Sequence, residues 1–347
     1  MNIDFETTTR EMNTVRDRNQ VSSFLSEQGL SLAQDVGYTL AVFRKGEMIG
    51  TGSLEGRVLK SIAVKKNYQG TGVTNKIVSE LVNEAYYRGQ RHLFVYTKPE
   101  NRKFFEDLGF YGVAEVTDRV CLLENQKEGI QGFVRELKRE KIKGEIIGSI
   151  VMNCNPFTLG HQYLIEKAAK ECDGVHVFVL WEERSSFPSN VRYELVKKGV
   201  AHLSNVRVHK GRDYVISGAT FPSYFIQGDE AVVEAQASLD VTVFKEYIAP
   251  ALGINRRYVG EEPYCAVTSL YNKTMGKILP KAGIEVRVIP RKKREELAIS
   301  ASMVRKGLAE QGVGSVRSLV PESTYHFLLS GEARGIIEKL GKENRRH

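Results

Sequence analysis

The sequence predicts an α/β protein of two domains, a mixed α+β domain followed by a domain built on a parallel sheet. Three observations support this prediction. The chain has 347 residues, which is long for a single hydrophobic core. Its first third contains short strands and helices with a tight hairpin signal, whereas regular strand-then-helix alternation begins at Glu145. Residues 125–144 are poor in apolar side chains, so we expect domains at 1–124 and 145–347.

The first domain opens on a predicted hairpin, because Lys45-Gly46 separates two runs rich in strand-forming residues. The expected strands are Tyr38–Arg44, Glu47–Leu54, Val58–Val64, His92–Thr97, Gly109–Val113 and Arg119–Leu123, and the expected helices are Asn75–Tyr87 and Glu100–Leu108. In the following segment, Phe133, Val134 and Leu137 keep a partial helical spacing, which predicts a linker helix within 125–144.

The second domain repeats a strand followed by a helix, and this alternation is typical of a parallel sheet with crossover helices. The expected strands are Ile146–Met152, Val175–Leu180, Val206–His209, Val241–Phe244, Arg257–Gly260 and Glu285–Ile289, with helices such as Gln162–Lys170 and Val191–Val200 between them.

Composition excludes several classes of protein. No apolar run approaches the roughly 20 residues of a membrane span, and Met1–Arg10 is polar, so we expect neither a membrane partner nor a targeting segment. The four cysteines form no Cys-x-x-Cys pair, which argues against a zinc site and for a reducing cytoplasm. We therefore predict no metal-ligating residues.

The charge balance is mildly basic. An excess of +8 suits phosphate-bearing ligands or an acidic partner, but without clustering it does not indicate nucleic-acid binding. The densest cluster, Arg291–Arg294, is interpreted as a solvated loop rather than a binding patch.

A loop containing proline and glycine follows the first strand of the second domain. It runs from Asn153 to His161, where the helical pattern of Gln162–Lys170 begins. The amides and positive dipole end of that helix would face the loop, so a phosphate can dock there with His161 beside it. We expect the loop to be shaped by Asn155, Pro156 and Phe157.

A second polar segment lies at a predicted helix start much later in the chain. Ser300 and Ser302 offer hydroxyls, and Arg305 adds a guanidinium one turn later. Ser300 by itself would be a simple helix N-cap, and that role is compatible with binding a ligand.

Together the two segments resemble the Thr/His-x-Gly-His and Ile-Ser-x-Ser/Thr-x-x-Arg motifs of the nucleotidylyltransferase superfamily. The resemblance implies a Rossmann-like domain that attacks the α-phosphate of a nucleoside triphosphate and releases pyrophosphate. It implies catalytic roles for Thr158, His161 and Arg305, a close backbone approach at Gly160, and phosphate binding by Ser300 and Ser302. Such chemistry is mainly positioning and charge neutralisation.

A glycine loop in the first domain also lies between a strand and a helix. Gln69, Gly70, Thr71 and Gly72 can point consecutive amides at an anion. With the segment from Asn101 to Phe110, this loop resembles the GNAT N-acetyltransferase fold, and the resemblance implies binding of a CoA-like group by the loop and Asn101. Two positions depart from that family: Thr74 stands at the last motif position, and Phe105 replaces a tyrosine that could protonate a leaving thiolate.

Three further residues are weaker candidates for nucleotide binding. Arg192 opens a predicted helix after Pro188, where it could reach a triphosphate or lie in solvent. Gly260 and Glu261 follow a strand at the edge where open parallel sheets bind ligands, although the acids there could instead pair with Arg256 or Arg257.

A GNAT-like domain ahead of a nucleotidylyltransferase-like domain resembles the citrate lyase ligases. That resemblance covers nearly the whole chain and implies an acid–thiol ligase with two substrates besides ATP. Acetate would be activated as acetyl-adenylate, with AMP and pyrophosphate released. The acetyl group would then pass to the thiol of the dephospho-CoA-derived prosthetic group on the acyl carrier subunit of citrate lyase. Mg²⁺ is expected with ATP, because the triphosphate charge needs a cation beyond Arg305.

Two other functions remain open from the sequence. One is an adenylyltransferase of CoA or NAD biosynthesis with an accessory acetyltransferase domain. The other is a non-catalytic sensor that binds nucleotide and CoA-like ligands through two inherited folds.

Overall fold

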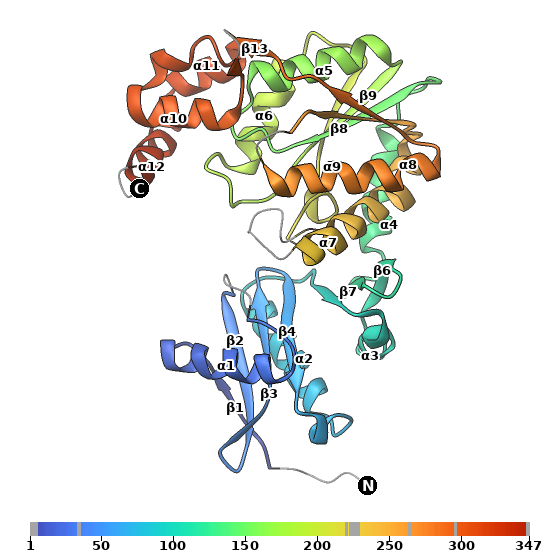
Figure 1. The fold of residues 1–347 in the computed structure, drawn as a ribbon, viewed down its shortest axis with the longest axis vertical. Coiled ribbons are helices and arrows are strands. Elements are labelled where there is room, and N and C mark those ends of the chain that lie inside the picture. The colour runs from blue at the N-terminus through green and yellow to red at the C-terminus, as the bar shows by residue number, and fades with distance from the viewer. Residues whose placement is uncertain are drawn as a thin grey trace. The chain divides into compact units, whose positions relative to one another are not determined.

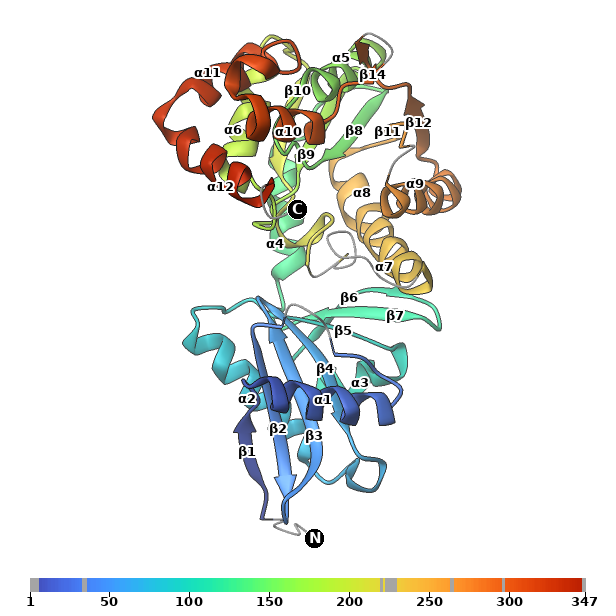
Figure 2. The same ribbon diagram turned by 60° about the vertical axis from the view of Figure 1, so that its left-hand side comes forward.

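Two compact units make up the chain, Met1–Gly129 and Ile130–His347. The computed structural model describes residues 6–32, 36–218, 221, 230–262, 265–294 and 297–344. Figures 1 and 2 show the elements of each unit from two directions.

In its described residues, the first unit is a mixed sheet covered by three helices. The described strands lie in the order β1-β2-β3-β4-β5-β7-β6, and among them only β4 and β5 run parallel. The strands are β1 (Thr8–Glu11), β2 (Tyr38–Arg44), β3 (Glu47–Glu55), β4 (Val58–Val64), β5 (Phe94–Thr97), β6 (Tyr111–Val116) and β7 (Val120–Glu124), and the helices are α1 (Val15–Glu27), α2 (Val73–Tyr87) and α3 (Arg102–Asp107). The mixed α+β architecture predicted for this part of the chain is confirmed.

Apolar side chains fix one helix on each face of this sheet. α2 buries Ile77 and Leu81 against β3, where a Cβ added to Gly52 would lie 2.5 Å from the Ile77 side chain. α1 buries Phe24 and Leu25 in a separate cluster with Ala41. Neither β1 nor α1 was predicted from the sequence, although α1 begins with a capping box between its N-cap threonine and an aspartate three residues on.

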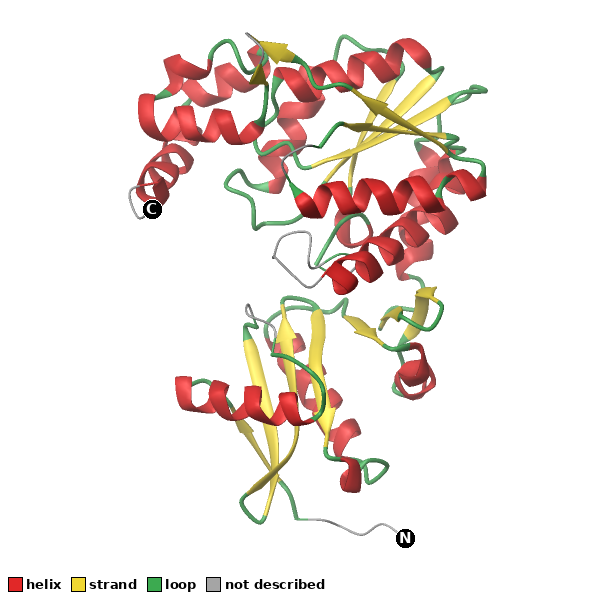
Figure 3. Cartoon of the chain, in the orientation of Figure 1, coloured by secondary structure: helices red, strands yellow, loops and turns green. Residues whose placement is uncertain are grey.

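The second unit is a five-stranded parallel sheet between helices, as Figure 3 shows in yellow and red. The strand order is β10-β9-β8-β11-β12. Thus β9 and β10 lie on one side of β8, and the later strands β11 and β12 lie on its other side. The strands are β8 (Ile147–Met152), β9 (Gly174–Val179), β10 (Val206–Lys210), β11 (Arg256–Gly260) and β12 (Glu285–Ile289). Open parallel sheets bind ligands where the order reverses, at the carboxyl ends of the strands. Here that point lies between β8 and β11.

The helices of this unit are α4 (Gly129–Arg139), α5 (Leu159–Glu171), α6 (Ser189–Gly199), α7 (Glu230–Val243), α8 (Ala249–Leu252), α9 (Ala266–Ile278), α10 (Ala301–Gln311), α11 (Glu322–Leu329) and α12 (Arg334–Asn344), and a two-stranded ribbon joins β13 (Lys293–Arg294) to β14 (Leu297–Ala298). α4 lies within the segment predicted as a linker helix, and its Phe133 ring stacks on Tyr214 of the second unit at 5.3 Å. α10, α11 and α12 share a small core that includes Val304, Leu308 and Leu328.

The strand predicted at Val241–Phe244 is wrong. Val241–Val243 end α7, and a π-helical turn continues through Phe244–Ile248. The run was mistaken for a strand because its β-branched residues are all buried, and a short buried apolar run has no periodicity that separates strand from helix. Among the described residues, no helix is long and apolar enough to cross a membrane.

Candidate active site

The loop after β8 ends in a reciprocal cap that holds His161. The hydroxyl of Thr158 accepts a hydrogen bond from the His161 backbone N–H at 3.3 Å. In return, the Thr158 backbone N–H donates to Nδ1 of the His161 ring at 3.1 Å. Thr158 is buried, so this cap fixes the imidazole at the first turn of α5.

These contacts determine the protonation of the imidazole. A backbone N–H can only donate, so Nδ1 of His161 is the acceptor and the ring proton resides on Nε2. Burial, assisted by the positive charge of Arg291, lowers the pKa of His161 to about 4. The ring also stacks on Phe157, with centroids 6.0 Å apart. His161 is therefore a neutral, rigidly held hydrogen-bond donor at neutral pH.

The two predicted motifs lie against each other in the fold. A Cβ added to Gly160 would lie 2.8 Å from the Ile299 carbonyl oxygen, so only glycine allows this approach. Arg305, one turn into α10, donates from Nη1 to the carbonyl oxygen of Asn155. Residues separated by 150 positions thus share one site beside the switch point of the sheet.

Hydroxyl groups gather at the start of α10. Ser300 is the N-cap, and its hydroxyl accepts from the Met303 backbone N–H at 3.2 Å. The hydroxyls of Ser300 and Ser302 lie 2.9 Å apart. Burial lowers the pKa of Arg305, which stays far above neutral pH for a guanidinium. The cluster offers donors of the kind that bind phosphate oxygens.

Asn155, Pro156 and Phe157 form a buried framework under the loop. Oδ1 of Asn155 accepts the backbone N–H of Phe187 at 2.9 Å, and Phe157 is completely buried. The Phe157 carbonyl accepts from the hydroxyl of Thr324 at 2.9 Å. These side chains therefore shape the loop from beneath.

Arg192 differs from both sequence interpretations, since it neither points to solvent nor is free to reach a triphosphate. The side chain is fully buried, and its guanidinium donates to five protein oxygens. They are the carbonyls of Phe187, Asn153, Leu180 and Glu182 and Oδ1 of Asn153. Arg192 instead ties together the segments after β8 and β9, a role that a sequence pattern cannot distinguish from a phosphate contact.

At the carboxyl end of β11, Gly260 leaves open space, with no atom within 4 Å of an added Cβ. The Glu261 N–H donates to the Ile289 carbonyl at 3.0 Å, and its own carbonyl accepts from Nε of Arg291 at 2.6 Å. Nη2 of Arg291 also lies 2.5 Å from a Glu262 carboxylate oxygen. Glu262 therefore pairs with Arg291, and not with Arg256 or Arg257 as the alternative interpretation of these acids would have it.

Arg291 is held more firmly than expected from the sequence. It belongs to the basic cluster interpreted as solvated loop, yet its side chain donates to the Glu261 carbonyl, and its positive charge helps to lower the pKa of His161. The available signal was its position two residues after the end of the strand β12.

The glycine loop of the first unit follows β4 and leads into α2. Gly70 and Gly72 adopt φ of 76° and 89°, which disfavour other residues. Nε2 of Gln69 donates to the Val64 carbonyl at 3.2 Å, and the Thr71 hydroxyl donates to the Tyr68 carbonyl at 2.6 Å. Gly72 precedes α2 without a side-chain cap, which leaves the helix start open to an anion.

The other predicted residues of this unit follow β5, the parallel neighbour of β4. Nδ2 of Asn101 donates to the Thr97 hydroxyl at 3.1 Å, at the same end of the sheet as the glycine loop. Phe105 is buried in the core under α2 and offers no proton.

Comparison with known families identifies both halves of the chain. Residues 10–120 match the acetyltransferase (GNAT) domain, and residues 147–328 match the citrate lyase ligase C-terminal domain. The second match spans more than half of the chain. The chain belongs to the citrate lyase ligase family.

Full-length relatives agree with this assignment. The citrate (pro-3S)-lyase ligase of Escherichia coli is 38% identical over 314 residues, which cover 89% of this chain and 89% of that protein. The corresponding ligase of Haemophilus influenzae is 40% identical over 314 residues, 89% of this chain and 94% of that protein. The family therefore makes the chain an enzyme of the ligase class.

A shorter match bears on one of the rival functions. A phosphopantetheine adenylyltransferase of Finegoldia magna is 30% identical over 93 residues, 26% of this chain and 57% of that protein. The parallel sheet of this citrate lyase ligase family member thus resembles an adenylyltransferase fold. Because the match stops at a quarter of the chain, the full-length relatives decide against an enzyme of CoA or NAD biosynthesis.

Proposed function

We propose that this enzyme activates acetate with ATP and acetylates the thiol of the dephospho-CoA-derived prosthetic group on the acyl carrier subunit of citrate lyase. The observation that carries the proposal is the meeting of the two motifs around a neutral His161 whose donor is Nε2. Family membership supplies the ligase activity, ATP as its energy source and citrate lyase as its protein substrate.

In the first half-reaction, an acetate oxygen attacks the α-phosphorus of ATP, the bond to the β-phosphate oxygen breaks, and pyrophosphate leaves. Nε2–H of His161 donates to an α-phosphoryl oxygen as negative charge builds on it. Thr158 keeps the imidazole in this tautomer. Ser300, Ser302 and Arg305 hold the β- and γ-phosphates through hydroxyls and a guanidinium.

The nucleotide is held between the ends of β8 and β11. Gly160 allows a close backbone approach, and Asn155, Pro156 and Phe157 support the loop from below. Gly260 and Glu261 border the open space on the other side. We propose that Arg291, which Glu262 orients, supplies a further positive charge at this edge of the sheet.

Mg²⁺ enters with the triphosphate in this proposal. Among the described residues, no group of three His, Cys, Asp or Glu side chains could hold a metal ion. Mg²⁺ commonly keeps several waters and binds substrate phosphates. We therefore propose that phosphate oxygens and water are its main ligands.

In the second half-reaction, the carrier thiol attacks the acetyl carbonyl, the carbon–oxygen bond to AMP breaks, and the thiol proton passes to solvent. The Gln69–Gly72 loop binds the pyrophosphate of the prosthetic group through backbone amides, with Asn101 near its pantetheine arm. Phe105 leaves this site without the proton donor that acetyl-CoA chemistry uses. The GNAT-like domain therefore serves the acceptor.

The proposed division of the chain assigns acceptor binding to residues 1–124 and adenylate formation to residues 145–347, joined by a helix within 125–144. We also propose a cytoplasmic enzyme, which its four free cysteines support.

Pyrophosphate exchange into ATP tests the proposal directly. Exchange should depend on both acetate and Mg²⁺. Phosphopantetheine and nicotinamide mononucleotide serve as alternative acceptors in parallel assays. Exchange with either in place of acetate would support a biosynthetic adenylyltransferase, and exchange with none of the three would support a sensor.

A further inference from the structure

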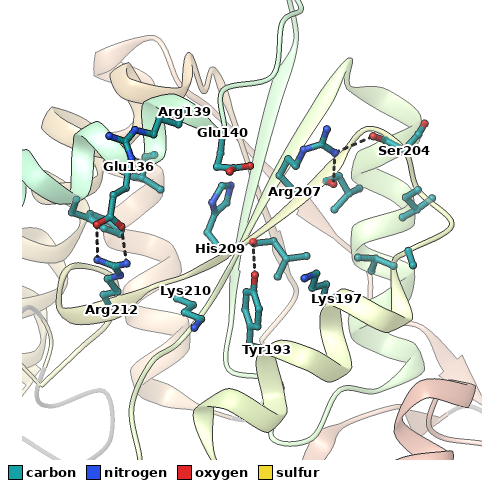
Figure 4. Close-up of a pocket in the computed structure, with 17 residues that line it drawn as sticks. Glu136, Arg139, Glu140, Tyr193, Lys197, Ser204, Arg207, His209, Lys210 and Arg212 are labelled. Carbon is teal, nitrogen blue, oxygen red and sulfur yellow. Dashed lines mark hydrogen bonds and ion pairs between the residues drawn. The ribbon is translucent and has the colours of Figure 1, made fainter.

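A second concave region lies outside the candidate active site. It is a groove of about 720 Å³ along the edge strand β10, between α4 on one side and α6 on the other (Figure 4). None of the residues assigned to ATP or to the CoA-like group lines it. The proposed reaction therefore leaves this groove without a role.

The rim of the groove is positively charged. Five exposed cations line it against two carboxylates, and they come from α4, α6, β10 and the turn after β10: Arg139, Lys197, Arg207, Lys210 and Arg212. Arg212 is neutralised by Glu136 at 2.6 Å. The remaining excess of cations favours an anionic occupant.

Of the four remaining cations, Lys210 and Arg207 form ring contacts or hydrogen bonds with other described residues, whereas Arg139 and Lys197 do not. Nζ of Lys210 lies 4.6 Å from the Trp181 ring centroid, and Arg207 donates to two backbone carbonyls. Within the described part of the chain, neither Arg139 nor Lys197 forms a salt bridge. These two side chains are free to meet an external charge.

The interior of the groove is partly apolar. Leu203, Val208 and Tyr193 line it half-buried, and Phe133 and Leu137 line it with buried side chains. An apolar floor with a cationic rim suits a segment that carries both apolar and acidic side chains. A free nucleotide or acetate would not need such a floor.

We propose that this groove docks an acidic, amphipathic surface segment of the acyl carrier subunit. The inference rests on the proposed function, which requires the enzyme to recognise a protein as well as the group attached to it. Its support is the charge complementarity between the free cations and an acidic segment. Contacts of this kind accelerate encounter and select the partner.

The test reverses both free charges in the full-length enzyme, as Arg139→Glu with Lys197→Glu. Three activities are measured on each preparation: acetate-dependent pyrophosphate exchange, acetylation of free dephospho-CoA, and acetylation of the carrier subunit. The KM for the carrier should rise about tenfold, because the reversal turns two attractive contacts between exposed charges into repulsive ones. Exchange and dephospho-CoA acetylation should not change. The difference should shrink at high salt.

Lys281→Glu is the control for a charge reversal elsewhere, because Lys281 is also exposed on the same unit and lies outside the groove. A neutral pair, Arg139→Gln with Lys197→Gln, should show a smaller rise in KM. An unchanged KM, or a rise equal to that of Lys281→Glu, overturns docking at the groove. Parallel loss of exchange and carrier acetylation also overturns it, because the groove would then serve the fold or the first half-reaction.

Direct binding of the carrier subunit separates this inference from the proposed function. If wild-type enzyme shows no acetate-dependent exchange, the proposed function fails. The docking inference still stands if the carrier binds wild type and binds the charge-reversed variant more weakly. It fails if both bind the carrier equally.

Discussion

The two units each contain a strand, a loop and a helix start, and they use glycine for opposite reasons. In the first unit, Gly70 and Gly72 have positive φ, and an added Cβ would meet no atom within 4 Å. In the second unit, Gly160 has ordinary helical geometry, but an added Cβ would meet the Ile299 carbonyl at 2.8 Å. One glycine loop is shaped by backbone conformation, and the other by the close approach of two distant segments.

The helix starts differ in the same way. α2 begins without a side-chain cap, so its first amides remain available to a ligand. α5 begins with a reciprocal cap that occupies the His161 amide and fixes its ring. The loop before α2 is thus suited to bind a pyrophosphate group that does not react. The loop before α5 is suited to present a single side chain to a reacting phosphate.

The largest expected effect is on the capped loop. His161→Ala should slow adenylate formation by about 10²–10³-fold, because the Nε2–H contact strengthens only as charge develops in the transition state. ATP binding should weaken far less. Pyrophosphate exchange and nucleotide affinity measured together check this, with His326→Ala as a control at an exposed histidine. Unchanged exchange in a folded His161→Ala protein would remove His161 from the mechanism.

The next largest effect should separate the two loops by half-reaction. Gly72→Glu places a carboxylate where the proposed pyrophosphate docks, so carrier acetylation should fall at least about tenfold through like-charge repulsion. Acetate-dependent exchange should persist. Gly72→Ala isolates the backbone cost at φ 89°, about 1 kcal/mol, without added charge. Equal loss of both half-reactions in a stably folded Gly72→Glu protein would show that the site is not divided.

A smaller effect should distinguish packing from conformation. Gly160→Ala should cost about 1–3 kcal/mol of unfolding free energy, because the Ile299 carbonyl must move away from the new methyl group. Gly276→Ala in α9 is the matched control, since an added Cβ there meets nothing within 4 Å. The control should be neutral or slightly stabilising. Chemical denaturation of both variants measures this, and equal unfolding free energies would mean that the contact between the motifs is loose.

The effect that develops most gradually concerns pH. Burial lowers the pKa of His209 to about 4 and that of His176 to about 3, against an ordinary 6.5. Below pH 6.5 the two histidines are protonated in the unfolded chain but stay neutral in the folded protein. The free energy of unfolding should therefore fall as the pH drops. The slope should be about 1.4 kcal/mol per pH unit for each buried histidine.

Denaturation between pH 7 and 5 checks that slope, since most carboxylates titrate below this window. His209→Gln should make the slope shallower by one histidine's share, whereas His326→Gln, at an exposed position, should leave it unchanged. A flat profile for wild type would contradict the burial argument.

Elements with clear periodicity or turn signals were predictable from the sequence. Val58–Val64 and Glu285–Ile289 were predicted with the bounds that the structure shows, because turn residues flank both strands. Val241–Phe244 was not, since its burial comes from tertiary packing that no local pattern records. α1 was overlooked because its mixed composition weakens the helical stripe, although its cap was visible.

The site shows the same limit. Short motifs predicted that the loop before His161 and the helix start at Arg305 belong to one site, and the two segments do meet in the fold. Arg192 is buried on protein oxygens instead of reaching a ligand or solvent, and Arg291, interpreted as solvated, is held by Glu261 and Glu262. An arginine looks the same in the sequence whether its guanidinium donates to protein carbonyls or to a ligand. The acceptors around it are known only once the fold is known.

The contact between Arg305 and Asn155 also affects when the enzyme can become active during its synthesis. On a ribosome, β8 and its loop emerge 150 residues before the guanidinium that completes their surroundings. By then every strand of the parallel sheet has been translated, so the sheet can form around an incomplete site. In the mechanism proposed above, the nascent chain cannot form acetyl-adenylate until α10 has been released and folded back against the loop, so nucleotide binding would be among the last properties that it acquires.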